Sequence, residues 1–269
     1  MDCIEYGNRN GQLVVYFHGV PGSPEESSIF DSHAKEHNLK IICFDRFAID
    51  SASDSAAYYQ QLASQIRLKA ADQPIDIVGF SIGAHVALEV GRILQGQVGQ
   101  THLISPAAPI NGGDFLDSMA GGLVFKLAMN RPFIFSILSL VQKSLALLAP
   151  RLLVKMMFSS AAGKDKELIN QSQFKDSITS ILKYCFQNRI RGYMRDIKLY
   201  VAWLGDFADY TSSVIVWQGT EDNWSPPAMA SYLYEAIPGT RALELMEGLS
   251  HYSCLCGAAP EICRRLEQF

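Results

Sequence analysis

The sequence lacks a strong charge bias and the residue spacings of a zinc site, and its first twelve residues lack a long apolar run. Its 269 residues carry a formal net charge of −4, which argues against a nucleic-acid-binding surface spread over the whole molecule. Residues 1–12 contain Asp2, Glu5 and Arg9 and no apolar core segment, so we expect no secretory signal. We therefore expect a cytoplasmic protein that does not bind nucleic acid.

Disulfides and metal sites are not expected either. In the absence of an export signal, the six cysteines are predicted to be free thiols in a reducing compartment. Cys254, Cys256 and Cys263 could gather on a metal ion, but their spacing matches no familiar zinc pattern. The sequence predicts no metal and no other cofactor.

The composition is that of an ordinary globular protein, with 48% apolar and 19% charged residues. A chain of this length can bury a substantial core as one large α/β domain or as two small ones. No internal repeat, low-complexity tract or flexible linker divides it.

Short unbroken apolar runs alternate with helical patterns along most of the chain. Such runs are typical of parallel strands that are covered on both faces. The sequence therefore predicts an α/β fold with a mostly parallel central sheet flanked by helices on both faces. The expected strands are residues 1–7, 12–17, 40–45, 75–78, 101–105, 214–217 and 242–246, and the expected helices include 56–71, 84–94, 226–236 and 260–266.

Two local signals refine this prediction. Asn8-Arg9-Asn10-Gly11 is a turn sequence that would join the first two strands as a hairpin. Ser23, Pro24 and Glu26 have the spacing of a capping box, which predicts that a helix starts at Ser23.

Residues 110–210 interrupt the alternation of strands and helices. They contain no convincing strand, are rich in helix formers and are divided by Pro132 and Pro150. We expect an all-helical cap or lid at 110–210, inserted into a core formed by 1–109 and 211–269. Its apolar helices would cover a substrate pocket.

Contact of this cap with a membrane surface is the less favoured alternative. Residues from Leu123 to Phe158 include no acidic residue, and a basic apolar helix pair can lie on an anionic membrane. Residues 133–149 approach a membrane-spanning length, but Gln142 and Lys143 interrupt them. The basic residues of this stretch are Lys126, Arg131, Lys143, Arg151 and Lys155.

Gly79-Phe80-Ser81-Ile82-Gly83 lies between an expected strand and an expected helix. A sharp turn at this point would project the Ser81 hydroxyl from the sheet and aim the Ile82 amide at the group under attack. Small residues two positions either side of the serine allow the crowded turn. The alternative is that Ser81 is only a turn residue.

A serine hydroxyl becomes a good nucleophile only when a base lies within hydrogen-bond reach and a carboxylate orients that base. Asp222 and His251 each follow a late strand, in the order serine, acid, histidine. Both loops would open at the carboxyl ends of parallel strands, beside Ser81. Asp222 could instead be a simple turn residue, in which case the orienting carboxylate would be Glu221 or, less favoured, Asp206 or Asp209.

The other five histidines are weaker candidates for the base. His18 is expected to brace backbone, and His85, one helical turn after Ser81, is expected to pack. His33 and His37 resemble solvated helix residues, and His102 starts a strand.

Taken together, these signals resemble the α/β-hydrolase superfamily over nearly the whole chain. The matching residues are His18-Gly19-Val20-Pro21-Gly22, the turn at Ser81, Gly219 to Pro226 with Asp222, and His251. The resemblance is to the branch with a serine nucleophile and a helical cap, similar to carboxylesterases. One loop departs from it, because Asp45 to Asp50 has no glycine or proline where the family commonly has Asp-x-Pro-Gly-x-Gly.

The resemblance implies a role for each matching residue. Ser81 would be the nucleophile, His251 the general base and then acid, and Asp222 the residue that orients His251. The backbone N–H groups of Val20 and Ile82 would form the oxyanion hole.

The sequence therefore predicts a cofactor-independent serine hydrolase that cleaves an ester or related acyl bond of a small, largely apolar substrate. Trp224 and Tyr252, beside the two late loops, are expected to line the substrate pocket. The same three residues could instead hydrolyse C–C, lactone or thioester bonds, or carry out perhydrolysis. The capped scaffold could also serve as a small-molecule sensor, and the oligomeric state stays open.

Overall fold

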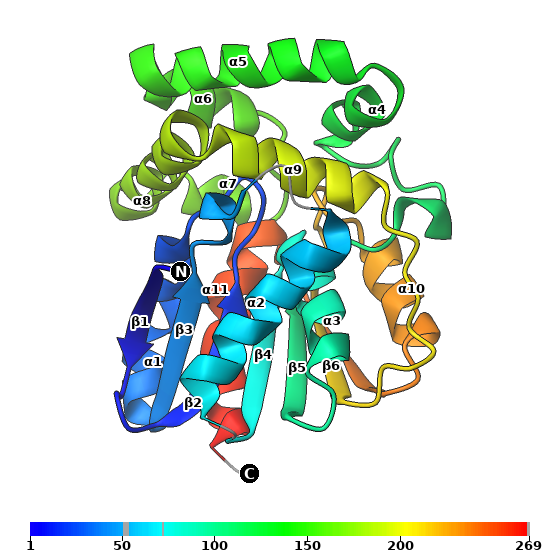
Figure 1. The fold of residues 1–269 in the computed structure, drawn as a ribbon. Helices are drawn as coiled ribbons and strands as arrows, with labels where there is room; N and C mark the ends of the chain where they lie inside the picture. The colour runs from blue at the N-terminus through cyan, green and yellow to red at the C-terminus, as the bar shows by residue number, and fades with distance from the viewer. Residues whose placement is uncertain (51–53, 72, 268–269) are drawn as a thin grey trace.

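The computed structural model describes residues 1–50, 54–71 and 73–267. Within them a central sheet of seven strands forms the middle layer (Figure 1), in the order β1-β3-β2-β4-β5-β6-β7. The strands are Cys3–Gly7 (β1), Gln12–Phe17 (β2), Leu39–Phe44 (β3), Ile75–Phe80 (β4), Val98–Ile104 (β5), Ser213–Gly219 (β6) and Thr240–Met246 (β7).

The strands from β2 to β7 are paired in parallel, and β1 alone runs antiparallel to its neighbour β3. The prediction of a hairpin between the first two strands is therefore wrong. β3 lies between β1 and β2, because its buried apolar residues pair with both of them. The turn at 8–11 joins two strands that are not adjacent.

Helices cover the sheet on both sides. α2 and α3 pack together on one face, and α1 and α11 pack together on the other (Figure 1). The helices are Asp31–Glu36 (α1), Ser55–Ala70 (α2), Gly83–Ile93 (α3), Gly122–Asn130 (α4), Pro132–Leu148 (α5), Pro150–Met157 (α6), Asp165–Leu168 (α7), Ser172–Lys183 (α8), Ile190–Val201 (α9), Pro227–Ala236 (α10) and His251–Leu266 (α11). The predicted fold class, a mostly parallel sheet between helices, is confirmed.

The helix predicted to start after Ser23 is present, but its capping box is not, and the predicted start of the last helix is wrong. Residues Pro24–Phe30 form a 3₁₀ helix in which the Ser23 side chain makes no capping bond. The Glu26 carboxylate turns inward instead, where it accepts hydrogen bonds from the Tyr16 hydroxyl at 2.8 Å and the Gly19 N–H at 2.8 Å. Burial of this side chain, which the local sequence does not reveal, overrides the capping pattern.

The last helix begins at His251 and not at residue 260, so Pro260 lies inside it. Proline usually marks a helix start, because it lacks the N–H that an interior position would donate. Here the first turn of α11 is held from outside the helix by the Asp165 carboxylate, which accepts from the N–H groups of Tyr252 at 3.0 Å and Ser253 at 2.7 Å.

Residues 110–210 contain α4 to α9 and, as expected, no strand. In Figure 1 these helices lie above one end of the sheet, and α5 is the outermost. α9 contacts the short 3₁₀ helix Arg46–Ala48 that follows β3. The approach requires Gly192, because a Cβ there would lie 2.3 Å from the Phe47 carbonyl oxygen. No helix in the described part of the chain is long and apolar enough to cross a membrane.

Candidate active site

Ser81 occupies a sharp turn between β4 and α3. Its φ of +56° lies in the left-handed region, which is energetically unfavourable for any residue that has a side chain. Contacts with the surrounding backbone hold Ser81 in this conformation. The Ser81 N–H donates to the Ile104 carbonyl at 3.0 Å, and the Ser81 carbonyl accepts from the Ala107 N–H at 3.1 Å. Both bonds tie the turn to β5 and the loop that follows it.

Close backbone contacts explain the two glycines of this turn. A Cβ at Gly83 would lie 2.1 Å from the Phe17 carbonyl oxygen, and one at Gly79 would lie 2.8 Å from the Ala84 Cα atom. No side chain fits at either position without moving backbone. The pattern of small residues therefore comes from the packing of α3 against β4 at Gly79 and against the end of β2 at Gly83.

Asp222 and His251 form a buried pair. The Asp222 Oδ2 atom lies 2.9 Å from His251 Nδ1, and both side chains are almost completely buried. Because a carboxylate only accepts, Nδ1 carries the shared proton and Nε2 is left as the basic atom. The other Asp222 oxygen accepts from the N–H groups of Trp224 at 2.8 Å and Ser225 at 3.0 Å, which fixes the carboxylate.

The alternative residues are placed elsewhere. Glu221, Asp206 and Asp209 are exposed to solvent. His85 is buried and contacts the Tyr59 hydroxyl through Nε2 at 2.7 Å, and His102 accepts from the Trp217 indole N–H at 3.1 Å. Burial lowers the pKa of both histidines to about 3, so both imidazoles are neutral packing groups.

The His251 ring lies beside the turn that holds Ser81. Its centroid is 4.7 Å from the ring of Phe80, and the Trp224 ring stacks on it at 5.5 Å. In the described residues the Ser81 hydroxyl does not hydrogen-bond to His251. Such contacts are often long in enzymes without substrate and tighten in the complex.

Val20 and Ile82 flank the same opening, and each lines a cavity together with Ser81. Neither N–H donates a hydrogen bond within the described residues. Two free amide N–H groups next to a serine on a sharp turn can donate hydrogen bonds to the negative oxygen of a tetrahedral intermediate.

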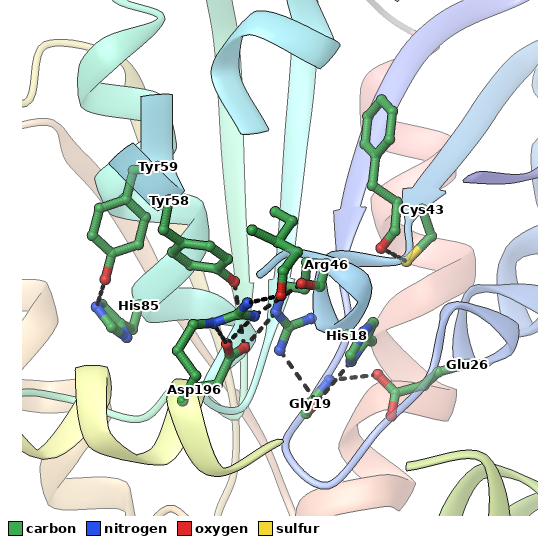
Figure 2. A network of polar contacts seen from close by, with 12 residues as sticks. His18, Gly19, Glu26, Cys43, Arg46, Tyr58, Tyr59, His85 and Asp196 are labelled. Carbon is green, nitrogen blue, oxygen red and sulfur yellow. Dashed lines mark hydrogen bonds and ion pairs between the residues drawn. The ribbon is translucent and has the colours of Figure 1, made fainter. Parts of the chain in front are cut away.

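The peptide between Gly19 and Val20 is held from its carbonyl side (Figure 2). The Gly19 carbonyl oxygen lies 2.8 Å from His18 Nδ1 and accepts a longer bond, 3.4 Å, from Arg46 Nη2. In a trans peptide the C=O and the N–H point in opposite directions. Because the Gly19 oxygen points toward His18 and Arg46, the Val20 N–H points away from these two residues. Burial, together with the nearby Arg46 charge, lowers the pKa of His18, so its imidazole is neutral.

Arg46 also belongs to a buried ionic cluster between the loop after β3 and α9 (Figure 2). Its Nε donates to one Asp196 oxygen at 2.8 Å, and Arg195 donates to the other at 2.7 Å. Arg195 further donates to the carbonyl oxygens of Ile49 and Arg46 at 2.9 Å each. These contacts join the loop that departs from the family pattern to the helical insertion.

A cavity of about 220 Å³ opens over Ser81. The core supplies Ser81, Val20, Ile82 and Trp224, among others, to its wall. Trp224 thus lines the cavity that contains Ser81, whereas Tyr252 lines a separate cavity with Glu26 and Phe174. The insertion supplies Met119, Ala120, Gly121, Val124, Phe125, Gln142, Met156, Met157, Ser159, Ser160, Tyr193 and Ile197.

Sequence reasoning missed these wall residues, the Arg46–Asp196 pair and the Asp165 carboxylate. Their contacts join positions 87 to 150 residues apart, and no local pattern marks them. The absence of glycine from the loop 45–50 is the one signal that pointed to unusual contacts there. Over residues 1–50, 54–71 and 73–267, no group of three or more histidine, cysteine, aspartate or glutamate side chains could hold a metal ion.

Comparisons with known proteins agree with the fold. The model of a family described as the alpha/beta hydrolase family matches residues 14–263. None of the curated proteins compared with the chain is a match.

Solved structures of several hydrolases and peroxidases have the same fold. A bromoperoxidase from Bacillus anthracis has a TM-score of 0.66 at 17% identity, covering 98% of this chain and 92% of its own. A serine hydrolase from Cycloclasticus zankles has a TM-score of 0.67 at 16% identity, covering 98% and 92%. An esterase from Exiguobacterium antarcticum has a TM-score of 0.62 at 17% identity, covering 99% and 95%.

Proposed function

Because the chain belongs to the alpha/beta hydrolase family, we propose that it is a serine hydrolase that cleaves an ester or related acyl bond through an acyl-enzyme. The buried contact between His251 and Asp222, beside the turn that carries Ser81, is the observation that carries this proposal. An acid that fixes Nδ1 of an imidazole is needed to leave Nε2 available as a base.

In the proposed reaction, His251 Nε2 takes the proton of Ser81 while Ser81 Oγ forms a bond to the substrate carbonyl carbon. The N–H groups of Val20 and Ile82 stabilise the resulting oxyanion, and each such donor is worth about 3–4 kcal/mol. The bond to the leaving group then breaks, and the leaving group receives the proton from His251.

Deacylation repeats these steps with water. His251 takes a proton from the water molecule as the water oxygen attacks the acyl carbon, and the bond to Ser81 breaks. Ser81 regains its proton from His251, and the carboxylic acid product leaves. Asp222 stays ionised throughout and stabilises the imidazolium.

The substrate proposed is a small, largely apolar ester. Of the cavity wall, Met156, Met157, Val124 and Phe125 are apolar, and Gln142 is a polar residue contributed by α5. We assign residues 110–210 to a cap, since this segment supplies most of the wall that would contact an acyl or alcohol chain.

Burst kinetics with p-nitrophenyl acetate and butyrate test this function. We expect one equivalent of p-nitrophenol per active site before the steady state, because acylation releases the alcohol first. Ser81→Ala and His251→Ala should each lower kcat at least 10³-fold. Ser159→Ala, which changes another serine of the cavity wall, should leave kcat within about threefold.

Retention of most turnover by Ser81→Ala would contradict the proposal. Wild-type protein that binds the esters without releasing p-nitrophenol would favour a small-molecule sensor.

A further inference from the structure

The outward face of α5 is more apolar than its buried face. Its exposed large apolar side chains recur at positions 133, 134, 137, 140, 141, 147 and 148, which is one face of a 3.6-residue helix. Phe133 is 77% exposed and Leu148 is 81% exposed. The buried face carries Phe135, but also Ser139 and Ala146. A helix that rests on a protein core normally has the opposite arrangement, with its apolar side turned inward.

Neighbouring helices extend this surface. Leu123 and Met129 of α4 and Leu152 and Met156 of α6 are exposed as well. Figure 1 places α5 at the outer boundary of the molecule, far from the sheet. We define the outer apolar face as Leu123, Met129, Phe133, Ile134, Ile137, Leu140, Val141, Leu147, Leu148, Leu152 and Met156. Monomers rarely expose so many large apolar side chains together unless they bind another surface.

The charged residues from α4 to α6 are all basic, although Asp176 of α8 lines a pocket together with Arg151 and Lys155. Arg131, Lys143, Arg151 and Lys155 are exposed, and in the described residues none of them forms an ion pair. Lys126 is paired with Asp117, and no acidic residue occurs from Leu123 to Phe158. A second copy related by a two-fold axis would bring the same cations together. An anionic lipid surface complements both the apolar and the basic side chains.

The outer apolar face meets the cavity at one residue. Met156 is about half exposed and also lines the wall over Ser81. α4, α5 and α6 thus each contribute residues to the outside and to the cavity, through Phe125, Gln142 and Met157 on the inner side.

We propose that the outer apolar face docks on the surface of an anionic lipid bilayer. α5 lies along the headgroup region, with its exposed side chains buried among acyl chains and the four unpaired cations at phosphate level. This docking goes beyond the proposed hydrolysis and does not depend on Ser81.

Co-sedimentation of the full chain with vesicles tests the docking. The vesicles are phosphatidylcholine alone or phosphatidylcholine with 30 mol% phosphatidylglycerol, in 50 mM and 500 mM NaCl. We expect binding to the anionic vesicles that weakens at least tenfold in high salt. Phe133→Ser combined with Leu148→Ser should weaken the binding at least tenfold. Arg131→Gln, Lys143→Gln, Arg151→Gln and Lys155→Gln combined should remove the preference for phosphatidylglycerol.

Leu68→Ser is the matched control, since Leu68 is 76% exposed on α2, outside this surface. It should bind as wild type does, and all variants should keep the wild-type melting temperature because the changed side chains are exposed. Wild-type protein that stays in the supernatant with both kinds of vesicle would overturn the proposal. So would equal loss of binding in Leu68→Ser, or a dimer in light scattering that Phe133→Ser with Leu148→Ser dissociates while no vesicles bind.

Discussion

At the scale of single residues, backbone contacts constrain the candidate site more than side-chain chemistry does. Gly83 is required because the Phe17 carbonyl occupies the place of a Cβ, and Ser81 is held at positive φ by bonds to β5 and its loop. The sequence reveals this turn because close approach can be read directly from glycine spacing. Asp222 and His251 were predictable by their order after late strands, but their contact is a property of the fold.

Glu26 shows what the sequence could not reveal at this scale. Its carboxylate lies in the core beside the loop of Val20, and burial raises its pKa from 4.5 to about 7. Hydrogen bonds from the Gly19 N–H and the Tyr16 hydroxyl oppose the shift. Protonation of this group is therefore favoured in the folded protein.

Glu26 should make the stability of the protein depend on pH. Because the pKa of Glu26 is raised in the folded state, its contribution to the free energy of unfolding is fully present below pH 4.5. That contribution is lost as the pH rises through about 7. This shift corresponds to about 3 kcal/mol of unfolding free energy. Urea unfolding at pH 4.5, 6, 7 and 8 should show this loss in wild type relative to Glu26→Gln. A constant difference between the two proteins across this range would contradict the assignment.

At the scale of elements, the helical insertion and the site are joined by polar contacts between distant segments. α7 contributes Asp165, whose carboxylate accepts from two amides in the first turn of α11. α9 contributes Asp196, which pairs with Arg46 after β3. The strand and helix patterns predicted which elements form. They could not predict these contacts, because Asp165, Asp196 and Arg46 are charged residues of types that usually lie on the protein surface.

Removal of the Asp165 carboxylate should weaken α11 at the residue that starts it, His251. Asp165→Ala leaves the N–H groups of Tyr252 and Ser253 without their acceptor, which should lower the free energy of unfolding by about 1–2 kcal/mol. Ester turnover should fall as well, since the first turn of α11 orients the imidazole. Chemical denaturation and kcat measure the two effects.

Asp176→Ala is the control, since Asp176 is an exposed acid on α8 of the same insertion. Its stability and kcat should match those of wild type. Equal stability of Asp165→Ala and Asp176→Ala would show that the contact to α11 contributes nothing.

At the scale of the whole molecule, the fold class follows from unbroken apolar runs that alternate with helical patterns. The runs at β2, β4 and β6 are buried on both faces, so a parallel sheet between helices was predictable. The position of β1 in the sheet was not predictable. A turn sequence indicates that the chain reverses direction, but it does not indicate which strand β1 pairs with. The two faces of α5 were not predictable either, because an apolar helix can turn its larger side chains inward or outward.

The central claim is that Ser81 is a nucleophile activated by the pair of His251 and Asp222. The most direct measurement is labelling of the intact protein with a fluorophosphonate, followed by peptide mapping of the adduct. We predict one adduct per chain on Ser81, absent in Ser81→Ala and slowed at least 100-fold in His251→Ala. An unlabelled wild-type protein, or an adduct that persists in Ser81→Ala, would contradict the claim.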